Sequence, residues 1–356
     1  MNRRCVALLS GGLDSTLAVL LLREQGIEVI ALRFMTHFGC GAGEGSSCGH
    51  DVTHLAKRFG FTIKLCHLGE EYVEMVRKPK HGWGKNMNPC IDCRIMMLRY
   101  AKDYMAAADA SFVVTGEVLN QRPMSQRRQP MDQVVKETGL EGILLRPLSA
   151  KLLEPTEPEK AGAVDRERLM GIHGRSRREQ VELAARFGLT DYAQPSGGCY
   201  LTDPIFSDKL RDLFAHTTGA PTDDINLLHV GRHFRLDGKT KVVVGRNEKE
   251  NDRLRTELAK PGDALLELHD GVGPLTLLRG ETTPESLQTA AGLVVKHSKA
   301  AKLGAVDVDA RFVQSDGKVS GSVVLRAPAL AQDEVEELRI VKSGAVAAAV
   351  GSGGSE

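Results

Sequence analysis

The sequence predicts an α/β protein, with a Rossmann-like parallel sheet covered by helices on both faces and a smaller α+β domain after it. Two observations lead to this class. Short β-like runs alternate with helix-like periods through the first half, which is typical of a parallel sheet. A hairpin signal at Asp237–Gly238 lies between apolar runs in the second half. With 356 residues, the chain is long enough for two domains.

The elements of the first half are placed by apolar periodicity and by the glycines that end them. We expect strands at Val6–Leu9, Glu28–Phe34, Thr62–Leu68, Phe112–Thr115 and Leu144–Leu148. We expect helices at Ser15–Gln25, Val52–Phe59, Tyr72–Arg77, Arg94–Ala108 and Arg177–Phe187. A helix at Asn251–Leu258 and a further strand follow the hairpin. The expected domains are 1–204 and 205–342, with an Ala/Gly/Ser-rich, disordered tail at 343–356.

Composition excludes several classes of protein. The net charge of +1 excludes a globally basic nucleic-acid binder, so any RNA-binding surface must be a local patch. Gly11, Gly12 and Asp14 interrupt the apolar run at Leu8–Leu22, which argues against a secretory leader and a membrane span. The seven cysteines are therefore interpreted as reduced thiols, available for metal binding or catalysis, in a cytoplasmic protein.

A glycine-rich segment, Ser10 to Ser15, follows the first strand and opens the first helix. Glycines let backbone N–H groups approach phosphate oxygens, and a helix N-terminus supplies free donors and a favourable dipole. The segment matches neither the Walker pattern nor the dinucleotide-binding fingerprint. A simpler interpretation is a turn in which Asp14 or Ser15 caps the helix. We favour a phosphate-binding loop.

Three cysteines suggest a reactive or ligating site. Cys90 and Cys93 lie in "NPCIDC" just before a helix, where the pKa of a thiol is lowered, and Cys199 lies in a glycine-flanked turn. Two close cysteines fit a redox disulfide, half a zinc site or part of a cluster. Three thiolates on a [4Fe–4S] cluster would leave one iron open for an external ligand.

These motifs resemble known families. "SGGLDS" resembles the PP-loop of the ATP-pyrophosphatase superfamily, whose members cleave ATP between the α- and β-phosphates to adenylate a substrate. "NPCIDC" and "GGCY" are similar to motifs of the bacterial tRNA 2-thiouridylases, and "TGEVLNQRPMSQ" (115–126) resembles a segment of the tRNA 4-thiouridine synthases. The resemblance implies an ATP-dependent tRNA sulfurtransferase that adenylates a uridine carbonyl and replaces its oxygen with sulfur.

The resemblance also implies site residues and partners. It places Asp14 at the pyrophosphate through Mg²⁺, Met35 near the adenine, and Asp14, Cys90 and Cys199 in catalysis. The ATP-binding set is Ser10, Gly11, Gly12, Asp14, Ser15, Met35 and Gly116. In one version of the sulfur step, Cys199 carries a persulfide and Cys90 attacks it. In the version we favour, Cys90, Cys93 and Cys199 hold a [4Fe–4S] cluster. The implied partners are tRNA and a sulfur donor, either a cysteine desulfurase or free sulfide, and a homodimer is compatible.

Other residues are weighed against simpler roles. "KPKHGWGKNMNP" (78–89) fits either an active-site lid or a solvated loop. Cys40, Cys48 and His50 fit a second metal site or, better, an irregular surface loop. Cys5 and Cys66 are expected to be buried apolar residues. The pocket candidates by resemblance are Glu117, Gln121, Arg122 and Gln126. Local basic clusters indicate phosphate contact, through Arg122, Arg127, Arg128, Arg175, Arg177 and Arg178.

The second domain resembles the RNA-binding domain of the NFACT proteins. The resemblance covers about residues 205–340 and rests on "HFRLDGKTKVVVGRNEKENDRL" and "KPGDALLELHDGVGP". It implies a platform for structured RNA, read by shape and backbone. Two other functions stay open. An ammonia- or amide-dependent PP-loop ligase would need no cysteine set, and a non-catalytic RNA-binding factor would carry a vestigial PP-loop.

Overall fold

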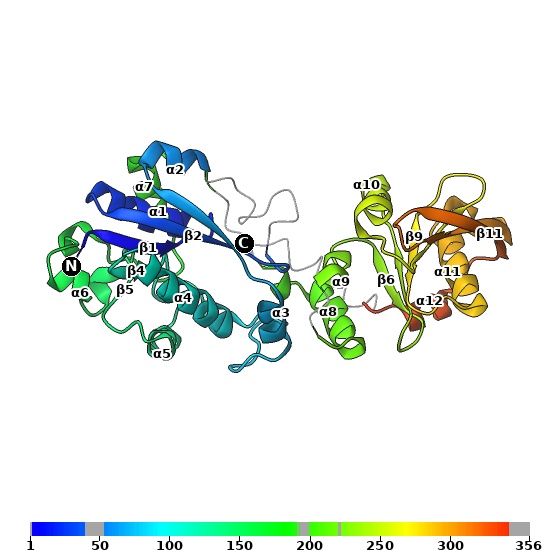
Figure 1. Cartoon of the computed structure of the whole chain (residues 1–356), viewed down its shortest axis with the longest axis horizontal. Coiled ribbons are helices and arrows are strands. Elements are labelled where there is room, and N and C mark those ends of the chain that lie inside the picture. Colours follow the sequence, from blue (N-terminus) through cyan, green and yellow to red (C-terminus); the bar gives the residue numbers. More distant parts are fainter. Residues whose placement is uncertain (1, 40–52, 191, 193–198, 220–221, 342–356) are drawn as a thin grey trace. The chain divides into compact units, whose positions relative to one another are not determined.

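A computed structural model describes residues 2–39, 53–190, 192, 199–219 and 222–341 (Figure 1). The chain divides into two compact units, Met1–Thr202 and Asp203–Glu356, two residues before the boundary expected from the sequence. The expected tail at 343–356 lies outside the described residues, as do Cys40, Cys48 and His50. None of the described helices is long and apolar enough to cross a membrane.

The first unit is built on a five-stranded sheet in which every neighbouring pair is parallel. Its order is β3-β2-β1-β4-β5. The strands are β1 (Arg4–Leu8), β2 (Glu28–Met35), β3 (Thr62–His67), β4 (Phe112–Val114) and β5 (Leu144–Leu145). The strand order reverses between β1 and β4. In open α/β sheets, ligands bind beside the carboxyl ends of the strands at such a switch point.

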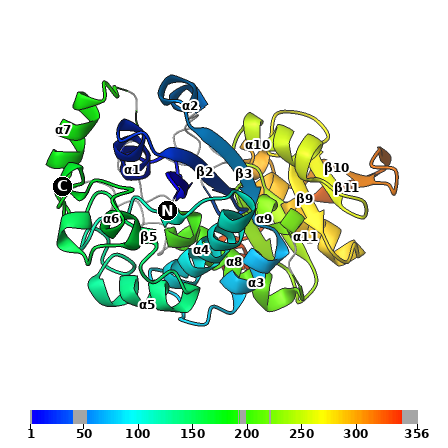
Figure 2. The ribbon, with the colours of Figure 1, turned by 60° about the vertical axis from the view of Figure 1, so that its left-hand side comes forward.

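Helices cover both faces of this sheet, as Figures 1 and 2 show. Alternate residues of β1 explain the arrangement, because successive side chains of a strand point to opposite faces. Cys5 and Ala7 pack with α1 and α7, whereas Val6 and Leu8 pack with α4 and α5. The helices are α1 (Leu13–Glu24), α2 (Thr53–Phe59), α3 (Glu70–Arg77), α4 (Cys90–Ala107), α5 (Arg128–Thr138), α6 (Glu157–Lys160) and α7 (Arg178–Arg186).

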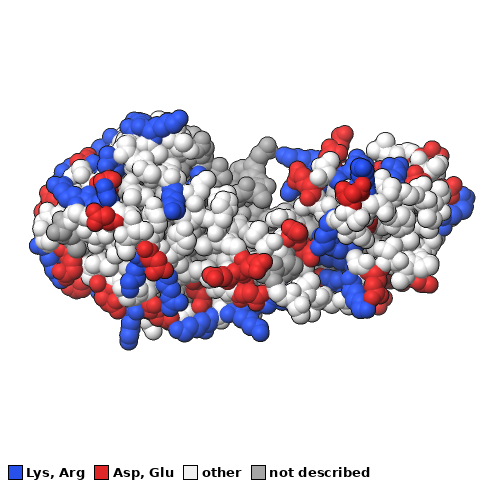
Figure 3. Space-filling model, viewed as in Figure 1, with Lys and Arg blue, Asp and Glu red and all other residues white. Residues whose placement is uncertain are grey.

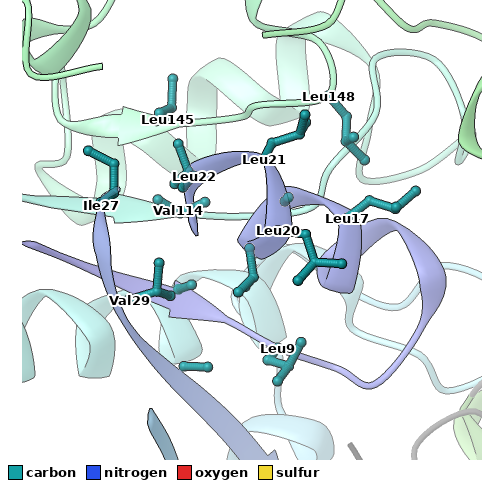
Figure 4. Close-up of a cluster of buried hydrophobic side chains, with 14 of the residues drawn as sticks. Leu9, Leu17, Leu20, Leu21, Leu22, Ile27, Val29, Val114, Leu145 and Leu148 are labelled. Atoms are coloured by element: carbon teal, nitrogen blue, oxygen red, sulfur yellow. The ribbon is translucent and has the colours of Figure 1, made fainter. Parts of the chain in front are cut away.

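The apolar run that opens the sequence forms the centre of this core. Leu17, Leu20 and Leu21 of α1 are at most 1% exposed and pack with Val29 and Val114 of the sheet (Figure 4). Burying one such side chain stabilises the fold by roughly 1.5–3 kcal/mol. The run is therefore a buried strand and helix, interrupted by the glycine-rich loop that joins them.

The second unit has a six-stranded antiparallel sheet of order β11-β10-β8-β9-β7-β6. The hairpin predicted across Asp237–Gly238 is confirmed as the β6–β7 pair. The strands are β6 (Arg232–Arg235), β7 (Lys241–Val244), β8 (Ala264–Leu268), β9 (Thr276–Arg279), β10 (Val306–Val313) and β11 (Val319–Ala327). The helices are α8 (Pro204–His216), α9 (Thr222–Leu227), α10 (Glu248–Arg253), α11 (Pro284–Lys296) and α12 (Gln332–Leu338). Buried residues of α11 pack on this sheet.

The helix starts that differ most from the sequence prediction are those of α4 and α10. Helix α4 begins at Cys90 rather than Arg94, so both cysteines of "CIDC" lie in its first turn. Helix α10 begins at Glu248 rather than Asn251, because the Asn247 side chain accepts a hydrogen bond from the backbone N–H of Glu250 and caps the helix there. It continues as a π-helical turn over Leu254–Leu258.

Candidate active site

The glycine-rich loop at residues 10–15 connects β1 to α1, at the switch point of the sheet. Gly11 has a φ of +83°, a conformation that side-chain-bearing residues rarely adopt. The Ser10 hydroxyl accepts from the Gly12 N–H at 3.3 Å, and the Ser15 hydroxyl donates to the Gly12 carbonyl at 2.9 Å. The residue before the helix is Gly12, which supplies no side-chain cap. The capped turn with Asp14 or Ser15 as N-cap is therefore wrong, and the first N–H groups of α1 are left for a ligand.

Gly116 brings a second loop against the first. A Cβ placed on Gly116 would lie 2.5 Å from the backbone nitrogen and Cα of Ser15 and 2.6 Å from the carbonyl carbon of Asp14. No side chain fits at that separation. The residues after β4 therefore touch the start of α1 through backbone alone, and the two loops form one wall. Met35 lies at the end of β2, next to β1, and so belongs to the same edge of the sheet.

Two glutamines in series hold the Asp14 carboxylate by hydrogen bonds. Gln121 Nε2 donates to Asp14 Oδ2 at 2.8 Å, and Gln180 Nε2 of α7 donates to Gln121 Oε1 at 3.2 Å. The direction of these hydrogen bonds is fixed because an ionised carboxylate only accepts hydrogen bonds. Asp14 Oδ1 is buried and has no hydrogen-bond partner among the described residues. A buried, unpaired carboxylate oxygen beside a phosphate loop suits Mg²⁺, which prefers oxygen ligands and phosphates.

Glu117 links this wall to the helix that carries two of the cysteines. It is 2% exposed, and its carboxylate lies 3.0 Å from Arg146 Nε and 3.3 Å from Arg94 Nε. Thr115 Oγ1 also donates to it, at 2.9 Å. Burial alone would raise the pKa of Glu117, but the positive charges of Arg94 and Arg146 outweigh it and lower the pKa. Since Arg94 follows Cys93 directly, its ion pair with Glu117 joins the helix that carries Cys90 and Cys93 to the wall formed by the glycine-rich loop and Gly116.

The three predicted cysteines surround one buried phenol. The Tyr72 hydroxyl donates to Cys93 Sγ at 3.1 Å. Burial and then the thiols of Cys93, Cys199 and Cys90 raise the pKa of Tyr72 well above its ordinary value. Residue 199 pairs with Gly39 in an isolated β-bridge. The structure thus brings together residues that are separated by more than a hundred positions.

The electrostatics of the thiols differ from expectation. We predicted that the helix N-terminus would lower their pKa values, but burial raises the pKa of both Cys90 and Cys93. The positive charge of Arg94 opposes burial at both sites, and Arg122 also lowers the pKa of Cys90. Desolvation wins because a thiolate is costly in an apolar environment. The free thiols are thus protonated near neutral pH.

Hydrogen bonds near both ends of the segment 78–89 connect it to the residues around the cysteines. The Asp92 carboxylate accepts from the backbone N–H groups of Lys80 and His81, at 3.1 and 3.0 Å. At the other end, Asn86 Nδ2 donates to the Thr202 carbonyl at 2.6 Å. These contacts place residues 86–89 between Cys90 and the segment of Cys199. The lid interpretation stays a prediction. The Trp83 ring is 48% exposed.

Two of the six arginines predicted to contact phosphate are engaged by acids. Arg128 pairs with Asp132 at 3.2 Å and Arg178 with Glu182 at 2.9 Å, each along its own helix. No side-chain partner is found for the others within the described part of the chain; these are Arg122, Arg127, Arg175 and Arg177. On the face shown in Figure 3, basic and acidic side chains intermix, in keeping with the small net charge.

The predicted [4Fe–4S] ligands are suitable in chemistry but not in their placement. The donor set is right in kind, since thiols ligate Fe–S clusters. However, the described residues contain no group of three or more His, Cys, Asp or Glu side chains placed to hold a metal ion. We therefore derive no chemical step through a cluster. Cys5 and Cys66 are buried, at 0% and 3% exposure, as expected of apolar residues.

Sequence reasoning missed four residues that build the site: Tyr72, Asp92, Arg94 and Gln180. Gln180 had a detectable signal. It lies three and four positions before Leu183 and Ala184, so it shares the buried face of its helix. A polar residue on such a face needs a partner. Nothing in the sequence pairs Arg94 with Glu117, which is 23 positions away.

Comparison with known proteins agrees with this architecture. Residues 1–151 match the family described as Thiamine biosynthesis protein (ThiI), and residues 231–338 match the NFACT protein RNA binding domain. The first unit is thus similar to a PP-loop family, and the second unit is similar to an RNA-binding domain. Relatives of the chain include tRNA-specific 2-thiouridylases of the MnmA type.

Individual relatives are distant. The tRNA-specific 2-thiouridylase MnmA of Fervidobacterium nodosum is 27% identical over 70% of this chain and 72% of its own length. The bifunctional protein NifU/MnmA of Rubrobacter xylanophilus is 32% identical over 30% of this chain, which spans only 23% of that relative. Among solved structures, the U34-tRNA thiolase NcsA from Methanococcus maripaludis with its [4Fe-4S] cluster is 18% identical. The match covers 64% of this chain and 72% of the NcsA chain, with a TM-score of 0.31.

Proposed function

We propose that this protein is an ATP-dependent tRNA sulfurtransferase that forms 4-thiouridine or 2-thiouridine. One observation carries the proposal. The segment Thr115–Glu117 touches the ATP loop through Gly116 and binds the cysteine helix through Glu117. An activation site and a thiol site are thereby held on one rigid element. A ligase that uses ammonia has no need for the second half of this arrangement.

The activation step uses the loop and Asp14. The uridine carbonyl oxygen attacks the α-phosphorus of ATP, the bond to the bridging oxygen breaks, and pyrophosphate leaves. The open N–H groups at the start of α1 bind phosphate oxygens. Asp14 Oδ1, which is buried without a partner among the described residues, would ligate Mg²⁺, and the ion would neutralise charge on the leaving pyrophosphate. Gly116 keeps side-chain atoms out of the wall beside the loop.

The sulfur step belongs to the three thiols around Tyr72. Cys90, Cys93 and Cys199 would hold a [4Fe–4S] cluster, which would supply an iron site for hydrosulfide. Sulfide or a cysteine desulfurase is the donor. Sulfur displaces AMP from the adenylated carbon, so the C–O bond breaks and a C–S bond forms. Loading of the cluster requires loss of the thiol protons, which the raised pKa values of Cys90 and Cys93 oppose.

A persulfide route uses only two of the thiols. A cysteine desulfurase first transfers its persulfide sulfur to Cys199. The terminal sulfur of the Cys199 persulfide displaces AMP, and Cys90 then attacks Cys199 Sγ. The S–S bond to the transferred sulfur breaks, the thiolated base leaves, and a Cys90–Cys199 disulfide remains for an external thiol to reduce. Cys93 is therefore the discriminating residue, because the cluster route needs it and the persulfide route does not.

The proposal is tested by nucleoside mass spectrometry of tRNA from a strain that lacks the protein. Loss of 4-thiouridine or 2-thiouridine is expected, and its identity gives the position modified. Retention of both at normal levels contradicts the proposal. In the reconstituted reaction with tRNA, ATP and sulfide, we expect AMP, pyrophosphate and thionucleoside in equal amounts.

Cysteine variants separate the routes when that assay is run twice, once with sulfide and once with a cysteine desulfurase and cysteine, which supply persulfide sulfur. Cys90→Ala and Cys199→Ala should abolish thiolation under either route. Cys93→Ala should abolish it, and lower bound iron and sulfide after anaerobic purification, only under the cluster route. Cys66→Ala is the matched control, because Cys66 is a buried cysteine of the same unit that lies on strand β3, outside the proposed site. If each of the three cysteine variants keeps the substrate-dependent ATP turnover of the wild type, the protein is a ligase that needs none of the three thiols.

A further inference from the structure

Three neighbouring strands of the second unit place positive charges side by side. In the antiparallel register, Arg235 of β6 lies opposite Lys241 of β7, and Lys241 lies opposite Arg279 of β9. Their side chains are only 16%, 7% and 11% exposed. Like charges directly opposite each other on neighbouring strands are destabilising, and burial increases that cost. Such a row persists only if negative groups compensate it.

Acids compensate the two outer members of the row. Asp212 of α8 accepts from Arg235 Nε at 3.1 Å. Asp263 accepts from Arg279 Nε at 3.0 Å, and Asp224 of α9 pairs with the same guanidinium. Each arginine thus has a carboxylate of its own. Helices α8 and α9, labelled in Figure 1, supply two of these three acids.

The central lysine is left without a matching acid. The nearest carboxylate oxygen to Lys241 Nζ is Asp212 Oδ2 at 4.0 Å, and that oxygen already accepts from Arg235. The side chain of Lys241 is only 7% exposed, yet its ammonium makes no hydrogen bond among the described residues. A buried ammonium needs hydrogen bonds and a counter-charge.

A cavity adjoins this lysine. It measures about 70 Å³ and is lined by all three members of the row, by Lys239 at the β6–β7 turn, and by His216 and Thr217 at the C-terminal end of α8. A water molecule needs only about 10–15 Å³ of such volume. The cavity therefore has room for a group of several heavy atoms. Four of its lining side chains are Lys or Arg, and Asp224 is its one acidic lining residue.

We infer that this cavity binds one phosphate group, with the Lys241 ammonium as its central ligand and Arg235 as a second donor. Several converging donors of fixed geometry favour a phosphate oxygen cluster, and arginine is suited to it. The Arg235 side chain spends Nε and Nη2 on Asp212, which leaves Nη1 for a ligand. The match to an RNA-binding domain over residues 231–338 supplies one source, an RNA phosphate, and free inorganic phosphate is the other.

The test uses the full chain without ATP, so that it is independent of the proposed catalysis. Thermal unfolding is followed while inorganic phosphate is titrated against chloride at matched ionic strength. We expect phosphate to raise the Tm of the wild type in a saturable way. Lys241→Met should abolish that rise, and Lys241→Gln is a second variant in case the first folds poorly. Lys318→Met, at an 83% exposed lysine, is the matched control and should keep the full rise.

A second arm separates the two sources. If an RNA phosphate occupies the cavity, Lys241→Met should weaken tRNA binding and lower its salt slope by about one, and free phosphate should compete with tRNA. If only free phosphate binds, tRNA affinity should stay unchanged while the phosphate-dependent Tm rise is lost. A phosphate response in Lys241→Met and Lys241→Gln equal to that of the wild type overturns the inference.

Discussion

The side-chain amide of Gln121 donates to Asp14 Oδ2 at 2.8 Å and thereby turns the other carboxylate oxygen into an unpaired, buried acceptor. The amide itself is held by Gln180, which is fully buried in α7. Gln180, which lies outside the glycine-rich loop, thus helps to orient the Asp14 carboxylate within that loop. This makes Gln180 a positioning residue.

Replacement of Gln180 by Glu should weaken the use of Mg²⁺. A carboxylate cannot donate, so the Gln121 amide would turn its Nε2 toward position 180 and present Oε1 to Asp14, oxygen against oxygen. A hydrogen bond to a charged group contributes about 1.5–3 kcal/mol, and its loss predicts a roughly tenfold or larger rise in the Mg²⁺ concentration needed for ATP cleavage.

The readout is the Mg²⁺ dependence of pyrophosphate release at saturating ATP. A merely structural role for Gln180 would lower the maximal rate and leave the Mg²⁺ midpoint in place, which would contradict the positioning role. Gln129→Glu introduces the same charge at an exposed site on α5 and should leave the midpoint unchanged.

Gly116→Ala tests the contact between the two loops. The added carbon would lie 2.5 Å from Ser15 backbone atoms, so the loops must separate. We expect ATP binding, measured by calorimetry, to weaken by roughly 5- to 150-fold, since forced backbone shifts cost about 1–3 kcal/mol. Gly69→Ala is the matched control, because a Cβ there meets nothing within 4 Å. Equal affinity in the two variants would contradict the proposed wall.

Local signals in the sequence were sufficient for the sheet and for the loop. The glycines of residues 10–15 and the alternation of Cys5 to Leu8 act within one strand–turn–helix unit, so their pattern is readable without tertiary information. The start of α4 was missed because the residue at its N-cap makes no side-chain cap hydrogen bond. Pro89 occupies the cap position, where a serine or aspartate would have marked the boundary.

Long-range pairing explains what the sequence could not predict at the site. The thiol pKa values followed from burial, and burial depends on which elements pack around Tyr72. The helix-terminus argument for lowered pKa values considered one element only. Local reasoning therefore singled out the three thiols as candidates but misjudged the protonation of Cys90 and Cys93.

Glu117→Gln should destabilise the first unit strongly. The change leaves the Arg94 and Arg146 guanidinium groups facing a neutral amide, and Arg146 is only 6% exposed. Breaking a buried ion pair from one side costs about 3–5 kcal/mol. Asp132→Asn removes one member of an exposed pair with Arg128 and should cost at most about 1 kcal/mol. Urea unfolding of both variants measures the difference, and similar losses would argue against a structural tie at Glu117.

Lys241 should give the second unit a distinctive pH dependence. Burial lowers its pKa to about 7; Asp212 opposes this shift, and the charges of Arg235 and Lys209 add to it. The remaining charged groups around it are Arg279 and Lys239, with Asp224 and His216 from the helices. In the unfolded chain the ammonium keeps its ordinary pKa of 10.5, so between pH 7 and 10.5 the unfolded state binds one more proton. The contribution of this lysine to stability therefore rises with pH across that window.

Lys241→Met removes this contribution, so the variant should gain most over the wild type at pH 7 and below. The advantage should shrink steadily as pH rises toward 9, as measured by urea unfolding at matched ionic strength without phosphate. Added phosphate should reverse the order at pH 7, because the anion stabilises the protonated lysine of the wild type alone. A stability difference between variant and wild type that is constant from pH 6.5 to pH 9 would contradict a titrating buried lysine at this position.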